Sequence, residues 1–352
     1  MKKTWINWLL PFVFIAVSCS KEDTPPVGPS TETKGIYILN EGNFNQNNAK
    51  LGFYSFETNT YTGDYFSQQN PGAAGLGDVA TDMVLYGSKL YIVVNNSNQV
   101  LVLNAATGVL IETISFAGRQ PRYALATQGK VFVTAYDGTV SAVDTGSLTL
   151  SHSITVGTNP EGIALSGNKL YVANSGGLNW PLYDSTISEI DLTTLTETRK
   201  ILVGKNPNSI AADDMGNLYV SCIGDYGSIA PKIVKVNAAT GSIVHQADTA
   251  VGVIRYYNNR LYVTGGFLGA NQVRTLSTTD FSVTSANIIS DGTSIQMPYG
   301  LDIDGVSEDY YITDAKDFVA TGTVFCFDAN GIQKFNISTS PGVLPNKLVF
   351  IR

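Results

Sequence analysis

The stretch VGTNPEGIALSGNKLYVANSGG, Val156–Gly177, contains a proline, a short apolar segment, a polar turn and a second apolar segment centred on Leu-Tyr-Val. Two short apolar segments around a turn with Gly and Asn are typical of a β-hairpin. Nearly the same pattern recurs at VATDMVLYGSKLYIVVNN, PRYALATQGKVFVTAYD, PNSIAADDMGNLYVSCIG, VGVIRYYNNRLYVTGGF and PYGLDIDGVSEDYYITDA. An internal repeat with this period indicates a repetitive fold.

Each of these six copies has an aromatic residue at the same place in its second segment, and the successive aromatics of the six are 39 to 49 residues apart. Two fragments complete one further copy: GIYILNEGN is a second segment without a first, and the C-terminal PNKLVFIR is a first without a second. The seven aromatics are Tyr37, Tyr91, Phe132, Tyr171, Tyr219, Tyr262 and Tyr311. Because side chains alternate along a strand, we expect all seven to fill the core between neighbouring repeats.

Each copy also carries a third and a fourth alternating segment, as in STISEIDLTTLTETRKILVG and KIVKVNAATGSIVHQADT. Four antiparallel strands per roughly 45 residues form the module of a β-propeller. The sequence therefore predicts an all-β, seven-bladed β-propeller over residues 35–352 with four-stranded antiparallel blades. Pairing of the C-terminal strand into the first blade would close the ring and remove its open edge.

The first 18 residues predict a secretory signal peptide, because Lys2 and Lys3 precede an apolar run that ends in small residues. That run is too short to favour a membrane span. Its end, Ala16-Val17-Ser18-Cys19, resembles a bacterial lipobox with Ala where Leu is usual, and predicts that Cys19 carries lipid. An ordinary cleaved signal with an incidental cysteine is the alternative.

Residues 19–34 are interpreted as the lipidated cysteine and a flexible tether, since TPPVGPSTET has little that could pack. The segment Ser20–Asp23 resembles the export signal of Bacteroidetes surface lipoproteins, although a solvated linker would also be charged. The resemblance implies that the protein is held at the outer membrane by lipid alone and is exposed on the cell surface.

Charge argues against nucleic acid as a partner. Removal of Lys2 and Lys3 with the signal peptide leaves 20 of the 22 basic residues against 29 acidic ones, a net charge of −9, and no Lys/Arg-rich run exists. Nucleic-acid binding therefore lacks its electrostatic basis. Cys222 and Cys326 fall in different repeats, so they are expected to be buried free thiols.

The segments KLYVANSG, NLYVSCIG and RLYVTGGF, with Pro-x-x-Ile/Leu ahead of several of them, resemble the YVTN-type, YncE-like seven-bladed propellers of bacterial surface proteins. The resemblance covers about residues 35–352. It is specific for architecture and says little about chemistry.

A ligand site is expected where the loops before each first strand and after each second strand surround the channel. These loops are rich in amides and aromatics, which suits a large, mostly uncharged polar ligand. Asparagine is also simply common in turns. The candidate ligand-binding residues are Trp180, Tyr123, Arg122, Tyr136, Asn174, Asn206, Asn208, Tyr226 and Phe267.

Signals of catalysis are weak, and the protein is not expected to be an enzyme. His152 and His245 fall on expected fourth strands, away from the channel, and no Gly-x-Ser-x-Gly motif is present. Asp302 and Asp304 are interpreted as turn residues. No metal site is expected, although a carboxylate-metal lactonase or lyase remains open through Glu41, Glu161, Asp225 and Asp314.

A propeller on a lipid tether with this export signal resembles the BtuG-type surface lipoproteins that capture cobalamin. The resemblance implies that the protein binds a corrinoid and passes it to a TonB-dependent outer-membrane transporter, with no cofactor of its own. A non-catalytic scaffold, or a glycan- or protein-binding propeller, is the alternative. Two triplets, Asp184-Ser185-Thr186 and Asp248-Thr249-Ala250, resemble the Bacteroidetes O-glycosylation pattern.

Overall fold

The computed structural model describes residue 1, residues 32–266 and residues 271–352. The expected signal peptide, Cys19, most of the tether and Phe267 lie outside these described residues. Within them, no helix is long and apolar enough to cross a membrane.

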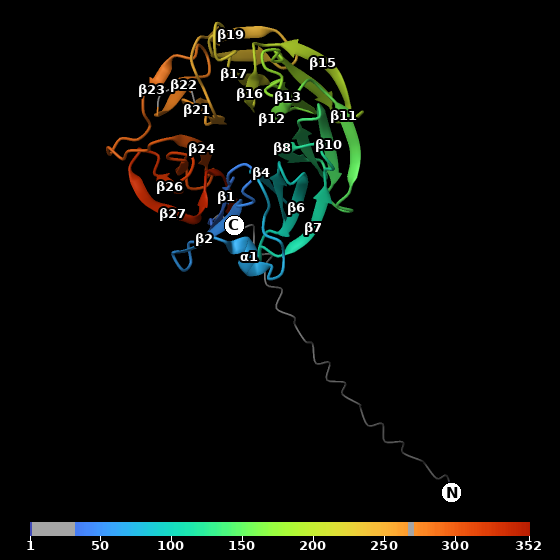
Figure 1. Ribbon diagram of the computed structural model, residues 1–352, viewed down its shortest axis with the longest axis vertical. Helices are drawn as coiled ribbons and strands as arrows, with labels where there is room; N and C mark the ends of the chain where they lie inside the picture. The colour runs from blue at the N-terminus through green and yellow to red at the C-terminus, as the bar shows by residue number, and fades with distance from the viewer. Residues whose placement is uncertain (2–31, 267–270) are drawn as a thin grey trace.

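Seven four-stranded antiparallel sheets form a ring, so the predicted seven-bladed propeller is confirmed (Figure 1). From the inner strand outward, blade 1 contains β28 (Pro345–Ile351), β1 (Gly35–Asn40), β2 (Lys50–Ser55) and β3 (Thr60–Thr62); blade 2 contains β4 (Ala80–Tyr86), β5 (Lys89–Val94), β6 (Gln99–Asn104) and β7 (Leu110–Ser115); blade 3 contains β8 (Pro121–Thr127), β9 (Lys130–Ala135), β10 (Thr139–Asp144) and β11 (Leu150–Thr155); blade 4 contains β12 (Pro160–Ser166), β13 (Lys169–Asn174), β14 (Thr186–Asp191) and β15 (Thr196–Leu202).

The remaining blades have the same order. Blade 5 contains β16 (Pro207–Ala212), β17 (Asn217–Cys222), β18 (Lys232–Asn237) and β19 (Ile243–Ala247); blade 6 contains β20 (Ile254–Tyr257), β21 (Arg260–Thr264), β22 (Val273–Ser277) and β23 (Val283–Ser285); blade 7 contains β24 (Pro298–Ile303), β25 (Tyr310–Asp314), β26 (Thr321–Phe327) and β27 (Gln333–Val343). A short helix, α1 (Tyr65–Gln69), follows β3, and the Asp64 carboxylate caps it by accepting from Ser67 N at 3.3 Å.

The ring closes as the split repeat predicts. Strand β28 pairs with β1 in antiparallel register, from Gly35 opposite Ile351 to Leu39 opposite Lys347. The C-terminus therefore lies beside the first blade (Figure 1). Strand β28 is therefore the innermost strand of that blade, and it covers the edge of β1 that would otherwise face the channel.

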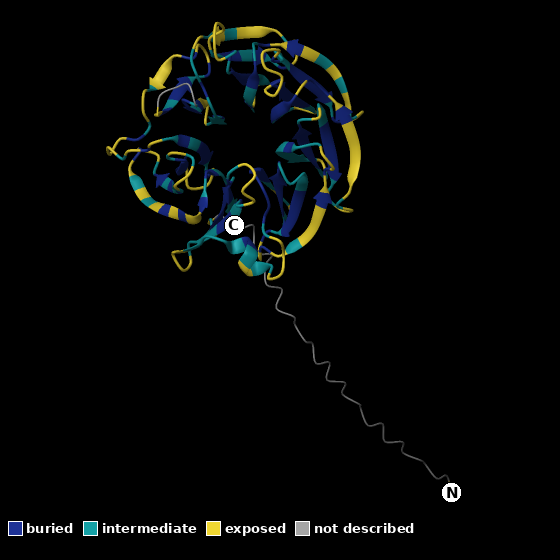
Figure 2. Cartoon of the chain, in the orientation of Figure 1, coloured by how far each residue is buried: buried dark blue, intermediate teal, exposed yellow. Residues whose placement is uncertain are grey.

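The core consists of seven apolar clusters, one between each pair of neighbouring blades. The repeat aromatics occupy these wedges: six of the seven are at most 1% exposed. The seventh, Tyr262, is only half-buried, but it packs against the cluster between blades 6 and 7. Figure 2 shows buried strands within the blades and exposed residues concentrated on the outer strands.

The structure also places the histidines, the cysteines and Asp302 that the sequence analysis considered. His152 lies on β11 and His245 on β19, the outermost strands of their blades. Cys222 and Cys326 are buried free thiols, as expected. Asp302 is the exception: it is a buried residue of β24 rather than a turn residue, and it belongs to the site described next.

Candidate functional site in the central channel

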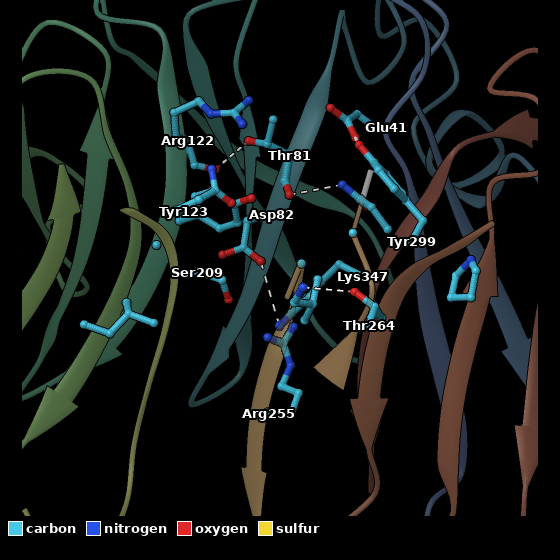
Figure 3. Close-up of a pocket in the computed structure, with 18 of the residues that line it drawn as sticks. Glu41, Thr81, Asp82, Arg122, Tyr123, Ser209, Arg255, Thr264, Tyr299 and Lys347 are labelled. Carbon is cyan, nitrogen blue, oxygen red and sulfur yellow. Dashed lines mark hydrogen bonds and ion pairs between the residues drawn. The ribbon is translucent and has the colours of Figure 1, made fainter. Parts of the chain in front are cut away.

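A cavity of ≈410 Å³ occupies the central channel and is lined by residues of all seven inner strands. Its walls are polar and charged more than aromatic (Figure 3). The polar side chains that line it include Glu41, Thr81, Asp82, Arg122, Tyr123, Asn208, Arg255, Tyr299, Asn346 and Lys347. Cavities of this size hold a small molecule or one part of a larger one.

Irregular strand pairing explains why so many side chains reach the channel. In six inner strands the register shifts just after the strand begins, for example between Pro121 and Ala124 and between Pro207 and Ile210. A β-bulge of this kind lets two successive residues oppose one on the partner strand and re-aims their side chains. Arg122 and Tyr123 therefore both line the cavity, although simple alternation would send one of them away.

The first polar group in the channel is centred on Glu161, which is 4% exposed. Its carboxylate accepts from Arg122 Nε at 2.9 Å and from the Tyr136 hydroxyl at 2.5 Å. The Arg122 guanidinium also lies 4.9 Å from the centre of the Tyr136 ring. Burial lowers the pKa of Arg122, but the Glu161 carboxylate outweighs it and holds the pKa well above the usual value. Arg122 is therefore a fixed cation whose terminal nitrogens have no hydrogen-bond partner among the described residues.

Glu41 and Tyr299 face this group from blades 1 and 7 (Figure 3). The Tyr299 hydroxyl donates to Glu41 Oε2 at 2.7 Å. Burial raises the pKa of the Glu41 carboxyl, and the bond from Tyr299 opposes that rise without cancelling it. Glu41 consequently keeps a proton to a higher pH than an exposed glutamate does.

A second polar group is centred on Asp302 deeper along the inner strands. Its carboxylate accepts from Arg255 Nε at 3.2 Å, Lys347 Nζ at 3.3 Å and Leu348 N at 2.9 Å. Asp82 completes the group, 3.9 Å from Lys347 Nζ, and accepts from Ala124 N at 3.0 Å. Burial raises the pKa of the Asp82 carboxyl, while Lys347 opposes the shift. Two cations thus offset two acids at this depth.

Three lining groups offer unused hydrogen-bonding capacity to a ligand. Among the described residues, the Tyr123 hydroxyl and the Asn208 side-chain amide have no hydrogen-bond partner. Asn346 Oδ1 is buried and also unpartnered, while its Nδ2 donates to Ala80 O and Thr81 O at 3.1 Å. A buried polar atom normally has a partner, so Asn346 Oδ1 is the position where a ligand's donor would bind, and the half-buried Tyr123 hydroxyl and Asn208 amide are free to join it.

The structure distributes the sequence-predicted residues over three environments. Arg122, Tyr123 and Asn208 line the cavity, and Tyr136 supports Arg122 through Glu161. Asn174 and Asn206 are buried, at 0% and 3% exposure.

The Asn174 amide is fully engaged: it donates to Thr186 Oγ1 and Ser188 Oγ and accepts from Gly157 N. Its polar atoms therefore serve the blade and are not directed into the channel.

Trp180 and Tyr226 lie on upper-face loops, meaning loops that precede first strands or follow second strands. Trp180 is 75% exposed and Tyr226 is 57% exposed. They belong to a larger set of exposed apolar side chains on loops after second strands, here called the apolar collar. It comprises Phe44, Leu178, Trp180, Leu182, Tyr226, Ile229 and Val319. They come from four loops, in blades 1, 4, 5 and 7, and all four loops lie on the upper face.

Sequence reasoning missed Thr81, Asp82, Ser209, Arg255 and Lys347, which also line the cavity. Alignment of the copies on Pro-x-x-Ile/Leu places Asp82, Ser209 and Lys347 in the same column as Tyr123. That column is the signal that identifies them once a bulge is recognised at the start of each inner strand.

The carboxylates considered for a metal lactonase do not form one group. Asp225 accepts from Gly227 N and Ile229 N within its own exposed loop, and Asp314 accepts from Met297 N and Lys316 N. Across residues 32–266 and 271–352, no cluster of three or more His, Cys, Asp or Glu side chains could hold a metal ion.

Residues 34–343 match a family model described as a domain of unknown function (DUF5074), and the chain belongs to that family. Among curated proteins, no match was found. Solved structures with a similar fold include hydrazine synthase of Kuenenia stuttgartiensis, at 20% identity and a TM-score of 0.56, covering 72% of this chain and 79% of that one.

Two further folds are similar at 12% identity. The computationally designed Ika8 protein has a TM-score of 0.58 and covers 88% of this chain and 89% of its own. A chain of the mitotic checkpoint complex has a TM-score of 0.59 and covers 87% of this chain and 97% of its own. At these identities the likeness shows the propeller fold alone.

Proposed function

We propose that this protein is a lipid-anchored cell-surface protein that captures a corrinoid such as cobalamin at the mouth of its channel, without catalysis, and passes it to a TonB-dependent outer-membrane transporter. The observation that carries the proposal is the apolar collar on the same face as the channel mouth, above a cavity with unpartnered polar groups. The resemblance to YncE-like surface propellers supports the same class of function.

The chemistry of a corrinoid matches this arrangement. Its ring system is broad and apolar, and amide groups project from its edge. The collar offers Trp180, Tyr226 and aliphatic side chains to the apolar part. A cavity of ≈410 Å³ takes a projecting group but not the whole ring system, so the corrinoid would rest on the mouth. Tyr123, Asn208 and Asn346 would then bind the group that enters.

Replacement of Trp180 by alanine tests the collar. A buried aromatic anchor at an interface commonly contributes about 2 kcal/mol or more, so Trp180→Ala is expected to weaken cyanocobalamin binding by over about tenfold. Calorimetric titration of the two proteins measures the difference. Ile111→Ala, an exposed apolar residue on the outer strand β7, serves as the matched control and should bind like the unmodified protein.

If Trp180→Ala binds cyanocobalamin as tightly as the unmodified protein, the collar is not part of the binding site, and the site would be the cavity residues around Arg122. The melting temperature should not change in either variant, because both side chains are exposed.

The anchoring half of the proposal is tested at residues 21–23. Replacing Lys21, Glu22 and Asp23 with alanine is expected to leave the protein facing the periplasm, because the segment after Cys19 resembles a surface-export signal. Protease accessibility on intact cells measures the orientation. Equal digestion of the altered and unmodified proteins would refute the export proposal.

The second candidate function is a surface scaffold that binds a protein through the collar. The exposed segment 177–182, which carries three collar residues, favours it, because exposed apolar patches also mark protein interfaces. A protein partner would use the collar without filling the cavity, so mutation of Asn208 would affect corrinoid capture and not scaffolding.

A further inference from the structure

A second cavity, of ≈280 Å³, lies on the lower face between blades 6 and 7, opposite the channel mouth. Turns after first and third strands form this face, and three of the lining residues are tyrosines. The lining residues are Tyr257, Asn258, Arg260, Tyr262, Glu308, Tyr310 and Ala329. It is separate from the corrinoid site proposed above.

This wedge lacks a hydrogen bond that three other blades make. In three other blades the repeat tyrosine donates to a carbonyl in the third turn of the next blade: Tyr37 to Ala105 O at 3.0 Å, Tyr171 to Ala238 O at 3.0 Å and Tyr219 to Thr278 O at 3.5 Å. The equivalent pair here is Tyr262 and Ala329. Among the described residues no hydrogen bond joins them, and both line the cavity instead.

The walls of this cavity are held in place. The Tyr310 hydroxyl donates to Ile288 O at 2.9 Å, and the Tyr257 hydroxyl donates to Glu308 Oε1 at 3.2 Å. The Tyr262 and Tyr310 rings lie 6.4 Å apart. Aromatic surfaces fixed by bonds at their rims are preorganised for a flat apolar face of a ligand.

The free polar groups determine what such a ligand must offer. Within the described part of the chain, the Arg260 guanidinium, the Asn258 amide and the Tyr262 hydroxyl have no hydrogen-bond partner, and Glu308 keeps one oxygen free. Donors and acceptors are therefore both available, and one cation offsets one acid. An anionic ligand would face Glu308 and a cationic one would face Arg260, so the balance favours a neutral ligand that both donates and accepts.

We propose that this lower-face cavity binds one neutral sugar ring, such as the terminal unit of a glycan. The apolar C–H face of a sugar packs on tyrosine rings, and its hydroxyls both donate to acceptors and accept from donors. The cavity volume lies just below the range of about 300–1,000 Å³ for small-molecule sites, which matches a single ring rather than a chain of sugars.

Saturation-transfer NMR with the methyl glycosides of glucose, galactose, mannose and N-acetylglucosamine tests the proposal. At least one glycoside should bind the full mature protein, and Arg260→Ala and Tyr262→Ala should each weaken it by about tenfold or more. Arg260 is exposed, so Arg260→Ala should fold normally, and its binding decides the test if Tyr262→Ala fails to fold. Trp180→Ala is the matched control and should bind the glycoside normally.

Binding of none of the four glycosides would overturn the proposal, as would binding that Arg260→Ala leaves unchanged. Failure here is distinguishable from failure of the corrinoid proposal, because Arg260→Ala should leave cyanocobalamin binding intact. Loss of glycoside binding in Trp180→Ala would also overturn it by placing the sugar at the collar.

Discussion

Deletion of residues 347–352 is expected to unfold the propeller. Lys347–Ile351 supplies five of the ladder positions opposite β1, and Leu348 and Val349 belong to the clusters on either side of blade 1. Each buried backbone group left unpaired costs about 1–3 kcal/mol, and a whole domain is stable by only about 5–15 kcal/mol. The truncated chain should therefore show no cooperative thermal transition by circular dichroism.

A chain that ends at Ile351 is the control. It keeps every ladder pair of β28 and loses only the ion pair of Arg352 with Asp304. It should still unfold cooperatively. A chain that lacks residues 347–352 and melts like the full protein would rule out closure through β28.

Replacement of Glu189 by alanine has the second largest expected effect. Glu189 is 2% exposed on β14, and its two carboxylate oxygens accept from Lys169 at 2.6 Å, Thr198 at 2.7 Å, Tyr171 at 3.0 Å and Arg199 at 2.8 Å. Removing one member of a buried ion pair commonly costs about 3–5 kcal/mol, because the partners lose their compensation. Chemical denaturation should show a loss in this range.

The matched control for Glu189 is Glu112, an exposed glutamate on the outer strand β7 whose carboxylate accepts from the neighbouring Thr113 N. Glu112→Ala should change the unfolding free energy by no more than about 0.5 kcal/mol. Equal effects of the two substitutions would contradict the structural role assigned to Glu189.

The contribution of Glu189 to the free energy of unfolding should depend on pH. Burial raises its pKa, but the bonds from Lys169, Thr198, Arg199 and Tyr171 outweigh burial and lower the pKa from 4.5 to about 2. The unfolded state therefore binds more protons between these values, and stability rises with pH in that window. The difference in unfolding free energy between the wild type and Glu189→Ala should be complete above pH 4.5 and should shrink as pH falls towards 2. A difference that stays constant across this range would contradict it.

The architecture was predictable because it repeats. An apolar hairpin with an aromatic residue at one position occurs seven times, and one of the seven copies is divided between the two termini. This pattern determines both the number of blades and the closure at β28. Tyr262 shows the limit of that reasoning: it lies between Leu and Val as Tyr219 does, yet it is half-buried whereas Tyr219 is fully buried. Burial depends on the neighbouring blade, which a repeat pattern does not specify.

The channel residues were only partly predictable, for a different physical reason. Strict alternation assigns Asp82 and Lys347 to the blade interior, whereas a bulge turns them to the cavity. Asn174 shows the reverse. Its place at the end of a strand predicted a side chain free to bind a ligand, but the side chain donates to two neighbouring hydroxyls and accepts from a backbone amide. Bulges and local hydrogen bonds decide which polar side chains remain free for a ligand.

Corrinoid capture is tested by titrating the full mature protein with cyanocobalamin and following both the heat of binding and the absorption spectrum of the corrinoid. We expect a heat of binding that saturates at one corrinoid per chain at micromolar protein, accompanied by a change in the corrinoid spectrum. Absence of both heat and spectral change at that concentration would contradict corrinoid capture and favour the scaffold.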